Sequence, residues 1–497
     1  MSRAVPTREQ LEWADCELGA IFHYDITVFE QDYRFRRSWG YQPSPQIFAP
    51  DALDTDQWIR AVAKAGVRYA VLVAKHCTGF ALFPSSANPY HVGNSPYGED
   101  IVKSFVESCK KYGIKPGVYY STVCNAYENV DNPGLVRTKD AGDQKHYNKV
   151  VETQLTELWS RYGEWFEIWF DGGTLSVEKG GLPIAPLLLR YQPNAITFQG
   201  DKLKKKNNLR WVGNEKGEAP FNCYSTTNDQ SQSEGTVQDA ALGRGNRNGT
   251  EWKPAECDMP IRKDNEWFYI DGHDKKVMSA DQLFDTYTKT VGRNCNLLLG
   301  VVIDRHGRVP EADAKVLAQL GQKIDDRFSI PIASAQGEAD GLTLTFPAYQ
   351  KVDTVVLEEE LANGHSIFGF AVEAHTKKGW KQVFAAETIG HKRIARFRAA
   401  YADGVRLRVT DGRQGAQLRG FQAYWLDCYS LAQKSRLLWT AVYKPDQFGP
   451  SAFSKRTSQA LAGQNAAGAR EVFVAQRGNQ SSPPAVLSEI CASAIKK

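Results

Sequence analysis

Two acidic side chains stand at points in the sequence where a strand is expected to end. Asp171 closes the run Phe166–Asp171 (FEIWFD) and is followed by two glycines, and Glu215 closes Leu209–Glu215 (LRWVGNE). Two carboxylates that face one cavity suit hydrolysis of a glycosidic bond, because one can attack or stabilise the anomeric carbon while the other protonates the leaving oxygen. An acid before Gly-Gly is equally typical of a turn. Glu256, in Pro254-Ala-Glu-Cys-Asp, is a rival to Glu215 for the acid role.

Aromatic residues are dense beside these acids, and two histidines end earlier strand-like runs. Flat rings can pack on the apolar face of a sugar, while His23 and His76 could hydrogen-bond its hydroxyl groups. Packing in the core is the alternative for the aromatic residues, which are Tyr119, Tyr120, Trp165, Trp169, Phe170, Trp211, Trp252, Trp267 and Phe268. The two histidines, with Asp171 and Glu215, could instead hold a divalent metal, but the absence of H-x-H or HExxH spacing makes this the second choice.

The first 325 residues alternate between strand-like and helix-like patterns, which suggests a (β/α)₈ barrel or a doubly wound sheet. No GxGxxG or GxxxxGK[ST] motif follows a strand, so the nucleotide-binding alternatives are weakened. In a barrel the polar residues at the strand ends would converge on one mouth. Helices are expected over 100–112, 143–162 and 280–291. The apolar runs expected to form buried parallel strands are 18–23, 68–76, 115–121, 166–171, 195–199, 209–215 and 296–303.

The pattern changes near residue 326. Short alternating strands at 342–346, 352–357, 368–373, 405–409 and 418–424 predict an antiparallel β-sandwich over 330–428. Residues 1–326 would then form the barrel domain. Residues 429–497 show no sustained period and are rich in Ala, Ser, Gln, Gly and Pro, so we expect them to be disordered.

Composition excludes several broad classes. Apolar residues make up 42% and charged residues 24% of the 497-residue chain, which are ordinary globular values. The chain contains no apolar run long enough to span a membrane and no apolar segment of a signal peptide near its start. Nine cysteines without a CxxC motif do not indicate a zinc ribbon. The excess of positive charge belongs to 429–497, and the KLKKK run at 202–206 is best explained as a solvated loop, so nucleic acid is not an expected partner.

The motifs around these residues resemble a known family. They are LGAIFHY from Leu18, AKHCTGFALFPS from Ala74, DIV from Asp100, GVYYS from Gly117, LTELW from Leu155, IWFDGG from Ile168, VGRN from Val291 and NLLL from Asn296. In this order, over about 18–325, they resemble the α-L-fucosidases of glycoside hydrolase family 29. The segment VGNE ending at Glu215, and the segment from Pro254 through Trp267-Phe268, resemble the subgroup that cleaves α-1,3/1,4-linked fucose.

The resemblance implies a retaining exo-glycosidase on a (β/α)₈-like barrel, followed by a β-sandwich of the galactose-binding-like type that either binds glycans or caps the barrel. Asp171 would be the nucleophile and Glu215 the acid/base. The fucose contacts that the resemblance implies are His23, His76, Tyr120 and Trp169; the density of aromatic residues adds Trp211 and Trp267 as expected stacking residues. The substrate would be a fucosylated oligosaccharide or glycoconjugate, and no metal or organic cofactor is expected. The family implies an extracellular, periplasmic, vacuolar or lysosomal setting, which the start of the sequence does not indicate. Asn248-Gly-Thr and Asn479-Gln-Ser are glycosylation sequons, but such triplets also arise by chance.

One departure from the family pattern affects the expected site. Members of the family usually carry K-H-H-D-G-F, whereas Cys77 and Thr78 stand here in place of the second histidine and the aspartate. The chain could therefore act on a different linkage, or it could be a weakened enzyme that binds fucosylated glycans without cleaving them. A metal-dependent sugar isomerase or hydrolase on the same barrel is a third hypothesis.

Overall fold

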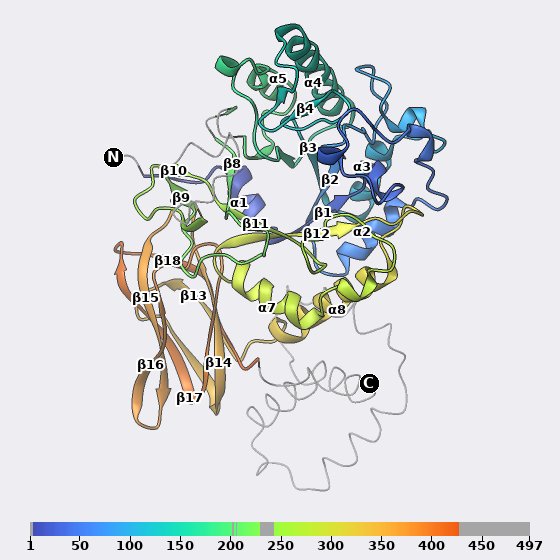
Figure 1. Ribbon diagram of the computed structural model, residues 1–497. Helices are drawn as coiled ribbons and strands as arrows, with labels where there is room; N and C mark the ends of the chain where they lie inside the picture. The colour runs from blue at the N-terminus through green and yellow to red at the C-terminus, as the bar shows by residue number, and fades with distance from the viewer. Residues whose placement is uncertain (1–2, 201–202, 205, 229–242, 427–497) are drawn as a thin grey trace, which may run out of the picture.

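The computed structural model describes residues 3–200, 203–204, 206–228 and 243–426. Eight parallel strands close into a barrel in the order β1-β12-β11-β8-β7-β6-β3-β2 (Figure 1). This confirms the barrel and removes the doubly wound alternative. The barrel strands are β1 (Leu18–His23), β2 (Tyr69–Lys75), β3 (Lys115–Tyr120), β6 (Glu167–Trp169), β7 (Ile196–Phe198), β8 (Asn208–Trp211), β11 (Ala255–Pro260) and β12 (Cys295–Val302).

Seven of these strands coincide with the predicted apolar runs, and the eighth does not. β11 was not predicted because Glu256 and Asp258, which stand at alternate positions along it, interrupt its apolar pattern. The predicted strand 209–215 is also shorter than expected, because β8 ends at Trp211 and Glu215 lies in the loop beyond it. The structure therefore places Glu256 on a strand and Glu215 in a loop, which is the reverse of the expectation from the sequence.

Helices surround the barrel on its outer face (Figure 1). The predicted helix at 100–112 is confirmed as α3: Asp100 caps it by accepting a hydrogen bond from Lys103 N at 2.9 Å, and Gly113 ends it in the left-handed conformation. In the described part of the chain, no helix is long and apolar enough to cross a membrane. The helices are α1 (Arg8–Ala14), α2 (Thr55–Ala63), α3 (Ile101–Tyr112), α4 (Ala141–Arg161), α5 (Ile184–Tyr191), α7 (Ala280–Thr290) and α8 (Glu311–Phe328).

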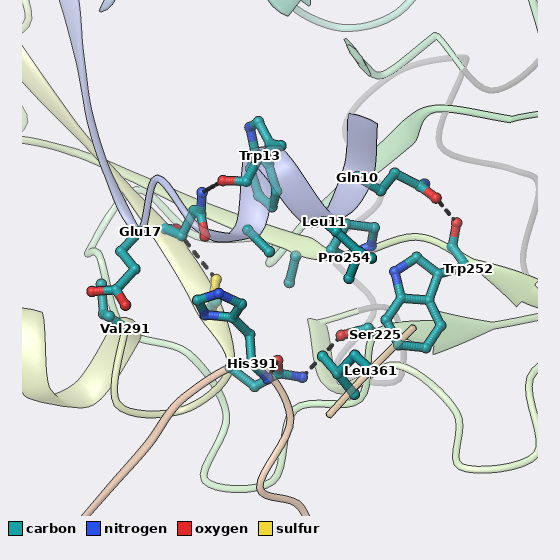
Figure 2. Close-up of a pocket in the computed structure, with 15 residues that line it drawn as sticks. Gln10, Leu11, Trp13, Glu17, Ser225, Trp252, Pro254, Val291, Leu361 and His391 are labelled. Carbon is teal, nitrogen blue, oxygen red and sulfur yellow. Dashed lines mark hydrogen bonds between the residues drawn. The ribbon is translucent and has the colours of Figure 1, made fainter. Parts of the chain in front are cut away.

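Helix α1 packs against the end of the barrel at which the strands begin. Figure 2 shows its residues Gln10, Leu11 and Trp13 around a small pocket there, beside Trp252 and Pro254. Gln10 Nε2 donates hydrogen bonds to the backbone oxygens of Asn208 at 3.1 Å and Trp252 at 3.0 Å. The side chain of Asn296, at the start of β12, donates to the backbone oxygen of Trp13 at 2.7 Å. The cavity left at this end is only about 10 Å³, room for about one water molecule, so a substrate has no space there.

The second domain is an antiparallel sheet of six strands in the order β13-β18-β14-β17-β15-β16. Its two longest strands carry register shifts, and its strands enclose one hydrophobic core, as expected for the predicted β-sandwich. The predicted strands 342–346 and 352–357 are two parts of one strand, β14. The bounds are β13 (Ala333–Glu338), β14 (Thr343–Glu359), β15 (Ile367–Thr376), β16 (Gly379–Ala386), β17 (Arg393–Gly412) and β18 (Gln417–Tyr424). Short pairs elsewhere are β4 (Val130–Asp131) with β5 (Leu135–Val136), and β9 (Thr226–Thr227) with β10 (Glu251–Trp252).

Polar contacts join the β-sheet domain to the barrel domain. Asp15, the C-cap of α1, accepts hydrogen bonds from Arg419 Nη1 and pairs with His391 Nε2, each at 2.7 Å. The hydroxyl of Tyr224 donates to Glu387 at 2.9 Å. The division of the chain at 326, 330 and 428 stays a prediction, and the segment 429–497 lies outside the described residues.

Candidate active site

A cavity of about 540 Å³ opens at the end of the barrel where the strands finish. This is the end at which barrel enzymes place their functional residues, because all eight strand-to-helix loops meet there. Six of the residues expected from the sequence line the cavity, together with others that were not expected. The lining includes His23, His76, Thr78, Tyr119, Trp169, Asp171, Glu215, Asp258, Trp267 and Phe268.

Asp171 lies two residues beyond the end of β6, and its carboxylate faces the cavity. The hydroxyl of Tyr119 donates a hydrogen bond of 2.7 Å to its Oδ2. Gly172 follows with a φ of 74°, and its N–H donates to Gln199 Oε1 at 2.7 Å, so the turn is fixed on both sides. Burial raises the pKa of Asp171, the Tyr119 hydrogen bond lowers it, and the charge of Glu215 raises it again. The result is a weakly solvated carboxylate suited to nucleophilic attack.

Glu215 lies on the exposed rim of the same cavity. Trp267 Nε1 donates to its Oε2 at 3.2 Å, and the side-chain amide of Asn265 donates to the same oxygen. Both partners come from the loop after β11, so this carboxylate is oriented by side chains although it lies outside a strand. An acid on the rim can reach a leaving group and solvent water, which are what an acid/base catalyst must contact.

His23 and His76 stand side by side, with ring centroids 6.1 Å apart. Phe268 packs on both rings at 5.2 and 5.0 Å. Burial lowers the pKa of His23 well below its usual value and that of His76 to about 3. Both rings are therefore neutral at neutral pH, and each can donate from one nitrogen and accept at the other. Nδ1 of His23 is buried without a side-chain hydrogen-bond partner among the described residues.

Tyr120, which was expected in the cavity, does not line it, whereas its neighbour Tyr119 does. Successive side chains of a strand point to opposite sides, and Tyr120 points outward, where its hydroxyl donates to Gln154 of α4 at 2.6 Å. Tyr119 instead stacks between His76 at 5.8 Å and Trp169 at 5.5 Å. The sequence placed both tyrosines at the strand end but did not show which of them faces inward.

Trp211 is also absent from the cavity wall, and Asp258 takes its place there. Trp211 lies beneath the surface and donates from Nε1 to Asp258 Oδ1 at 2.6 Å. Burial raises the pKa of Asp258 well above its usual value. Sequence reasoning missed this acid, although it is two residues after Glu256 in the segment already singled out and therefore on the same side of the strand.

Glu256 lies deeper in the barrel than the cavity and does not line it. Its side chain is fully buried and accepts hydrogen bonds from Tyr69 at 2.7 Å and from Trp169 Nε1 at 2.9 Å. Burial raises its pKa to about 7, although these hydrogen bonds lower it. In this position Glu256 has no direct path to a leaving group in the cavity.

The two departures from the family pattern are accommodated differently. The hydroxyl of Thr78 lines the cavity and lies 2.8 Å from both oxygens of Asp25, a buried carboxyl whose pKa burial raises to about 7. Cys77 is a half-buried free thiol 3.9 Å from Ser121 Oγ and is not part of the cavity wall. Within the described ranges, no group of three or more His, Cys, Asp or Glu side chains could hold a metal ion, so the metal hypothesis gains no geometric support.

Comparison with known families decides the class of protein. The model of the alpha-L-fucosidase family matches residues 3–326, which include the whole barrel and every cavity residue named above. The chain belongs to the α-L-fucosidase family. It is accordingly a glycoside hydrolase, and its activity is that of an α-L-fucosidase.

Individual relatives agree with this assignment. The chain is 27% identical to alpha-L-fucosidase 1 of Arabidopsis thaliana, with 89% of this chain and 92% of the relative covered. The crystal structure of a candidate α-L-fucosidase from Bacteroides thetaiotaomicron is 34% identical, covers 85% of this chain and 100% of its own, and has a TM-score of 0.79. A Ruminococcus gnavus GH29 fucosidase solved in complex with fucose has the same fold, with a TM-score of 0.71 at 22% identity over 85% of this chain and 95% of its own.

Proposed function

We propose that this chain removes terminal α-linked L-fucose from fucosylated oligosaccharides or glycoconjugates by double displacement, with retention of the anomeric configuration. The observation that carries the proposal is the pair formed by Asp171, which is half-buried and held by Tyr119, and Glu215, which is exposed on the rim of the same cavity and oriented by Trp267. Two carboxylates with these unequal environments suit the two roles that a retaining glycosidase requires.

In the first step Asp171 attacks the anomeric carbon and the bond to the leaving oxygen breaks. Glu215 gives its proton to that oxygen, and a β-fucosyl ester of Asp171 forms. In the second step Glu215 takes a proton from water, the water oxygen attacks the anomeric carbon, and the ester bond breaks to release α-L-fucose and the free carboxylate. The low polarity around Asp171 favours this ester, because the ester is neutral and the carboxylate is not.

The walls of the cavity fit a deoxy sugar. Trp169 and Trp267 offer flat apolar surfaces, while the neutral rings of His23 and His76 offer hydrogen bonds to hydroxyl groups. The rim continues with Arg34, Asn265 and Lys276, which could bind the sugars that remain on the leaving side. Because the VGNE segment resembles the subgroup acting on branched glycans, we propose the α-1,3 or α-1,4 linkage as the preferred one.

A release assay over α-1,2-, α-1,3-, α-1,4- and α-1,6-linked fucosyl oligosaccharides tests this proposal. We expect the α-1,3 and α-1,4 substrates to be cleaved fastest, and proton NMR at early times should show α-L-fucose as the first product. Faster cleavage of the α-1,2 or α-1,6 substrates would contradict the linkage, and β-L-fucose as the first product would contradict retention. Binding without release of any of them would support a glycan-binding protein instead.

The role of Glu215 is tested by its dependence on the leaving group. Glu215→Ala should cripple cleavage of natural fucosides but spare aryl fucosides whose phenolate leaves without a proton. Added azide should then yield the α-fucosyl azide, because the anion attacks the β-fucosyl enzyme. The matched control is Glu218→Ala, three residues along the same loop, where the carboxylate is exposed and pairs with Arg293 at 3.4 Å. If Glu218→Ala behaves in the same way, the assignment of Glu215 is wrong.

A further inference from the structure

Two glutamates lie inside the barrel beneath the candidate active site. Glu167 of β6 and Glu256 of β11 are both fully buried, on strands that are not neighbours in the barrel. The interior around them is an apolar cluster that includes Ile21, Val71, Val73 and Leu298. Because placing carboxyl groups in such surroundings is costly, two of them together must be held by specific hydrogen bonds.

The hydrogen bonds of the pair indicate how two carboxyls can share the barrel interior. Both oxygens of Glu256 accept bonds, one from Tyr69 at 2.7 Å and one from Trp169 Nε1 at 2.9 Å. Glu167 Oε2 accepts from Trp13 Nε1 at 3.2 Å, and no described group donates to its Oε1. Burial raises the pKa of both, and the hydrogen bond between the two carboxyls raises that of Glu167 and lowers that of Glu256. Two buried carboxyls that share a hydrogen bond are therefore best described as a pair that holds a proton in common.

The group that Glu256 holds is the indole that forms the floor of the cavity. The Trp169 ring stacks on Phe198 with centroids 3.8 Å apart and planes within 6°, and on Tyr119 at 5.5 Å and 20°. Stacking alone leaves a ring free to slide in its own plane, whereas a hydrogen bond at Nε1 fixes its direction. Tyr119 in turn donates to Asp171 at 2.7 Å.

We propose that Glu256 is a positioning residue: it fixes Trp169, which supports Tyr119 and so holds Asp171 in the orientation required for attack. Glu167 acts with it through the proton that the two carboxyls hold in common. This inference rests on the proposed role of Asp171 as nucleophile. It also gives Glu256 a role other than proton donor, because its oxygens are occupied and the cavity lies beyond its reach.

Two substitutions at Glu256 separate these roles. Glu256→Gln keeps an oxygen that can accept from Trp169 Nε1, and its amide can donate to Glu167 or to a rotated Tyr69 hydroxyl. Glu256→Met keeps the volume but loses both acceptors. We expect Glu256→Gln to stay within about tenfold of the wild-type kcat, and Glu256→Met to lose about 100-fold, since a small misplacement of a reacting group can cost that much. The loss should be equal for natural and aryl fucosides.

The opposite pattern would overturn the inference. If Glu256 were the acid, Gln and Met would fail alike, only natural fucosides would suffer, and azide would produce the α-fucosyl azide. A Glu256→Met enzyme with wild-type kcat and only a lower melting temperature would overturn it as well. Asp171→Gly is assayed together with these variants and should not hydrolyse fucosides. Should that variant remain active, it is the proposed function that fails.

Energetic coupling between Glu256 and Trp169 provides a measurement that a general loss of stability does not affect. Trp169→Phe removes the Nε1–H and keeps most of the ring, so it should reproduce the kcat loss of Glu256→Met. The double variant should then be no worse than either single variant, because both remove the same hydrogen bond. Losses that multiply would contradict the inference. If Glu256→Met does not fold, the kcat of Trp169→Phe, measured in a chain that retains Glu167 and Glu256, provides the test.

A buried carboxylate remote from the cavity serves as the structural control. Glu359 of β14 accepts hydrogen bonds from Ile367 N at 2.9 Å and Gly390 N at 3.2 Å inside the β-sheet domain. Glu359→Met should lower the melting temperature but leave kcat per folded molecule unchanged. If it lowers kcat as much as Glu256→Met does, the effect is not specific to the residues beneath the site.

Discussion

Asp171 is subject to opposing influences that can be separated by experiment. Burial and the charge of Glu215 raise its pKa, whereas the hydrogen bond from Tyr119 lowers it. An attacking carboxylate must be ionised, so the acid limb of a plot of kcat/KM against pH reports the pKa of Asp171 in the free enzyme. The balance between the influences thus decides the lowest pH at which the enzyme works.

Removing the Tyr119 hydroxyl should move that limb in a defined direction. The hydrogen bond stabilises the carboxylate, so its loss in Tyr119→Phe raises the pKa of Asp171, and the acid limb of kcat/KM against pH should shift to higher pH. Tyr120→Phe is the matched control, because its hydroxyl bonds to Gln154 outside the cavity. A shift in Tyr120→Phe with none in Tyr119→Phe would contradict the geometry described above.

At this scale the sequence identified part of the cavity wall but not its finer detail. His23, His76, Trp169, Asp171, Glu215 and Trp267 were predicted as site residues, and all line the cavity. Tyr120 and Trp211 were predicted too and do not. For Tyr120 the cause is strand register: a shift of one residue turns a side chain from the inner to the outer face, and a strand buried on both faces has no apolar alternation that reveals it. Trp211 does face the barrel interior, but it donates to Asp258, which lines the cavity instead.

Single elements explain where the prediction from sequence failed. Strand β11 was not predicted because its inward-facing positions carry Glu256 and Asp258. Glu256 accepts hydrogen bonds from Trp169 and Tyr69, and Asp258 accepts one from Trp211. Those partners come from distant segments, so nothing near 255–260 in the sequence signals them. Conversely, α3 was predicted correctly because its caps, Asp100 and Gly113, are local signals.

Helix α1 offers a prediction at the scale of one element. It closes the barrel end opposite the active site, where Trp13 is buried against Tyr69 with ring centroids 6.3 Å apart and donates to Glu167. Trp13→Ala should lower the free energy of unfolding by about 3–5 kcal/mol, the usual cost of deleting a buried Trp side chain. Denaturant unfolding monitored by circular dichroism measures it.

The neighbouring substitution Leu11→Ala is the comparison, because Leu11 lies on the same helix and is only half buried. It should cost clearly less than Trp13→Ala. Equal losses from the two variants would mean that α1 contributes through its general apolar surface rather than through the indole inside the barrel.

At the scale of the whole molecule, the two domains are joined by charged contacts such as Asp15 with His391 and Arg419. The change of sequence pattern near residue 326, where long apolar runs give way to short alternating strands, predicted a β domain after the barrel but not the contacts that join them. Which strands pair in the second domain could not be predicted, since antiparallel partners such as β14 and β18 are far apart in the sequence.

The composition of 429–497 supports a prediction about the complete chain. This segment is poor in residues that could bury enough apolar surface to offset the entropy of ordering. A chain ending at Cys428 should therefore keep the melting temperature and the specific activity of the full-length protein. A fall of many degrees on truncation, measured by differential scanning calorimetry, would show that the segment packs on the domains.

The central claim is that Asp171 forms a covalent bond to fucose, and Asp171→Gly with azide tests it most directly. The substitution should abolish hydrolysis without changing the melting temperature, because it opens no cavity in the core. With an aryl fucoside, added azide should restore turnover and give the β-fucosyl azide, since the anion occupies the space that the carboxylate leaves. Substantial hydrolysis by Asp171→Gly, or an azide product of α configuration, would contradict the account.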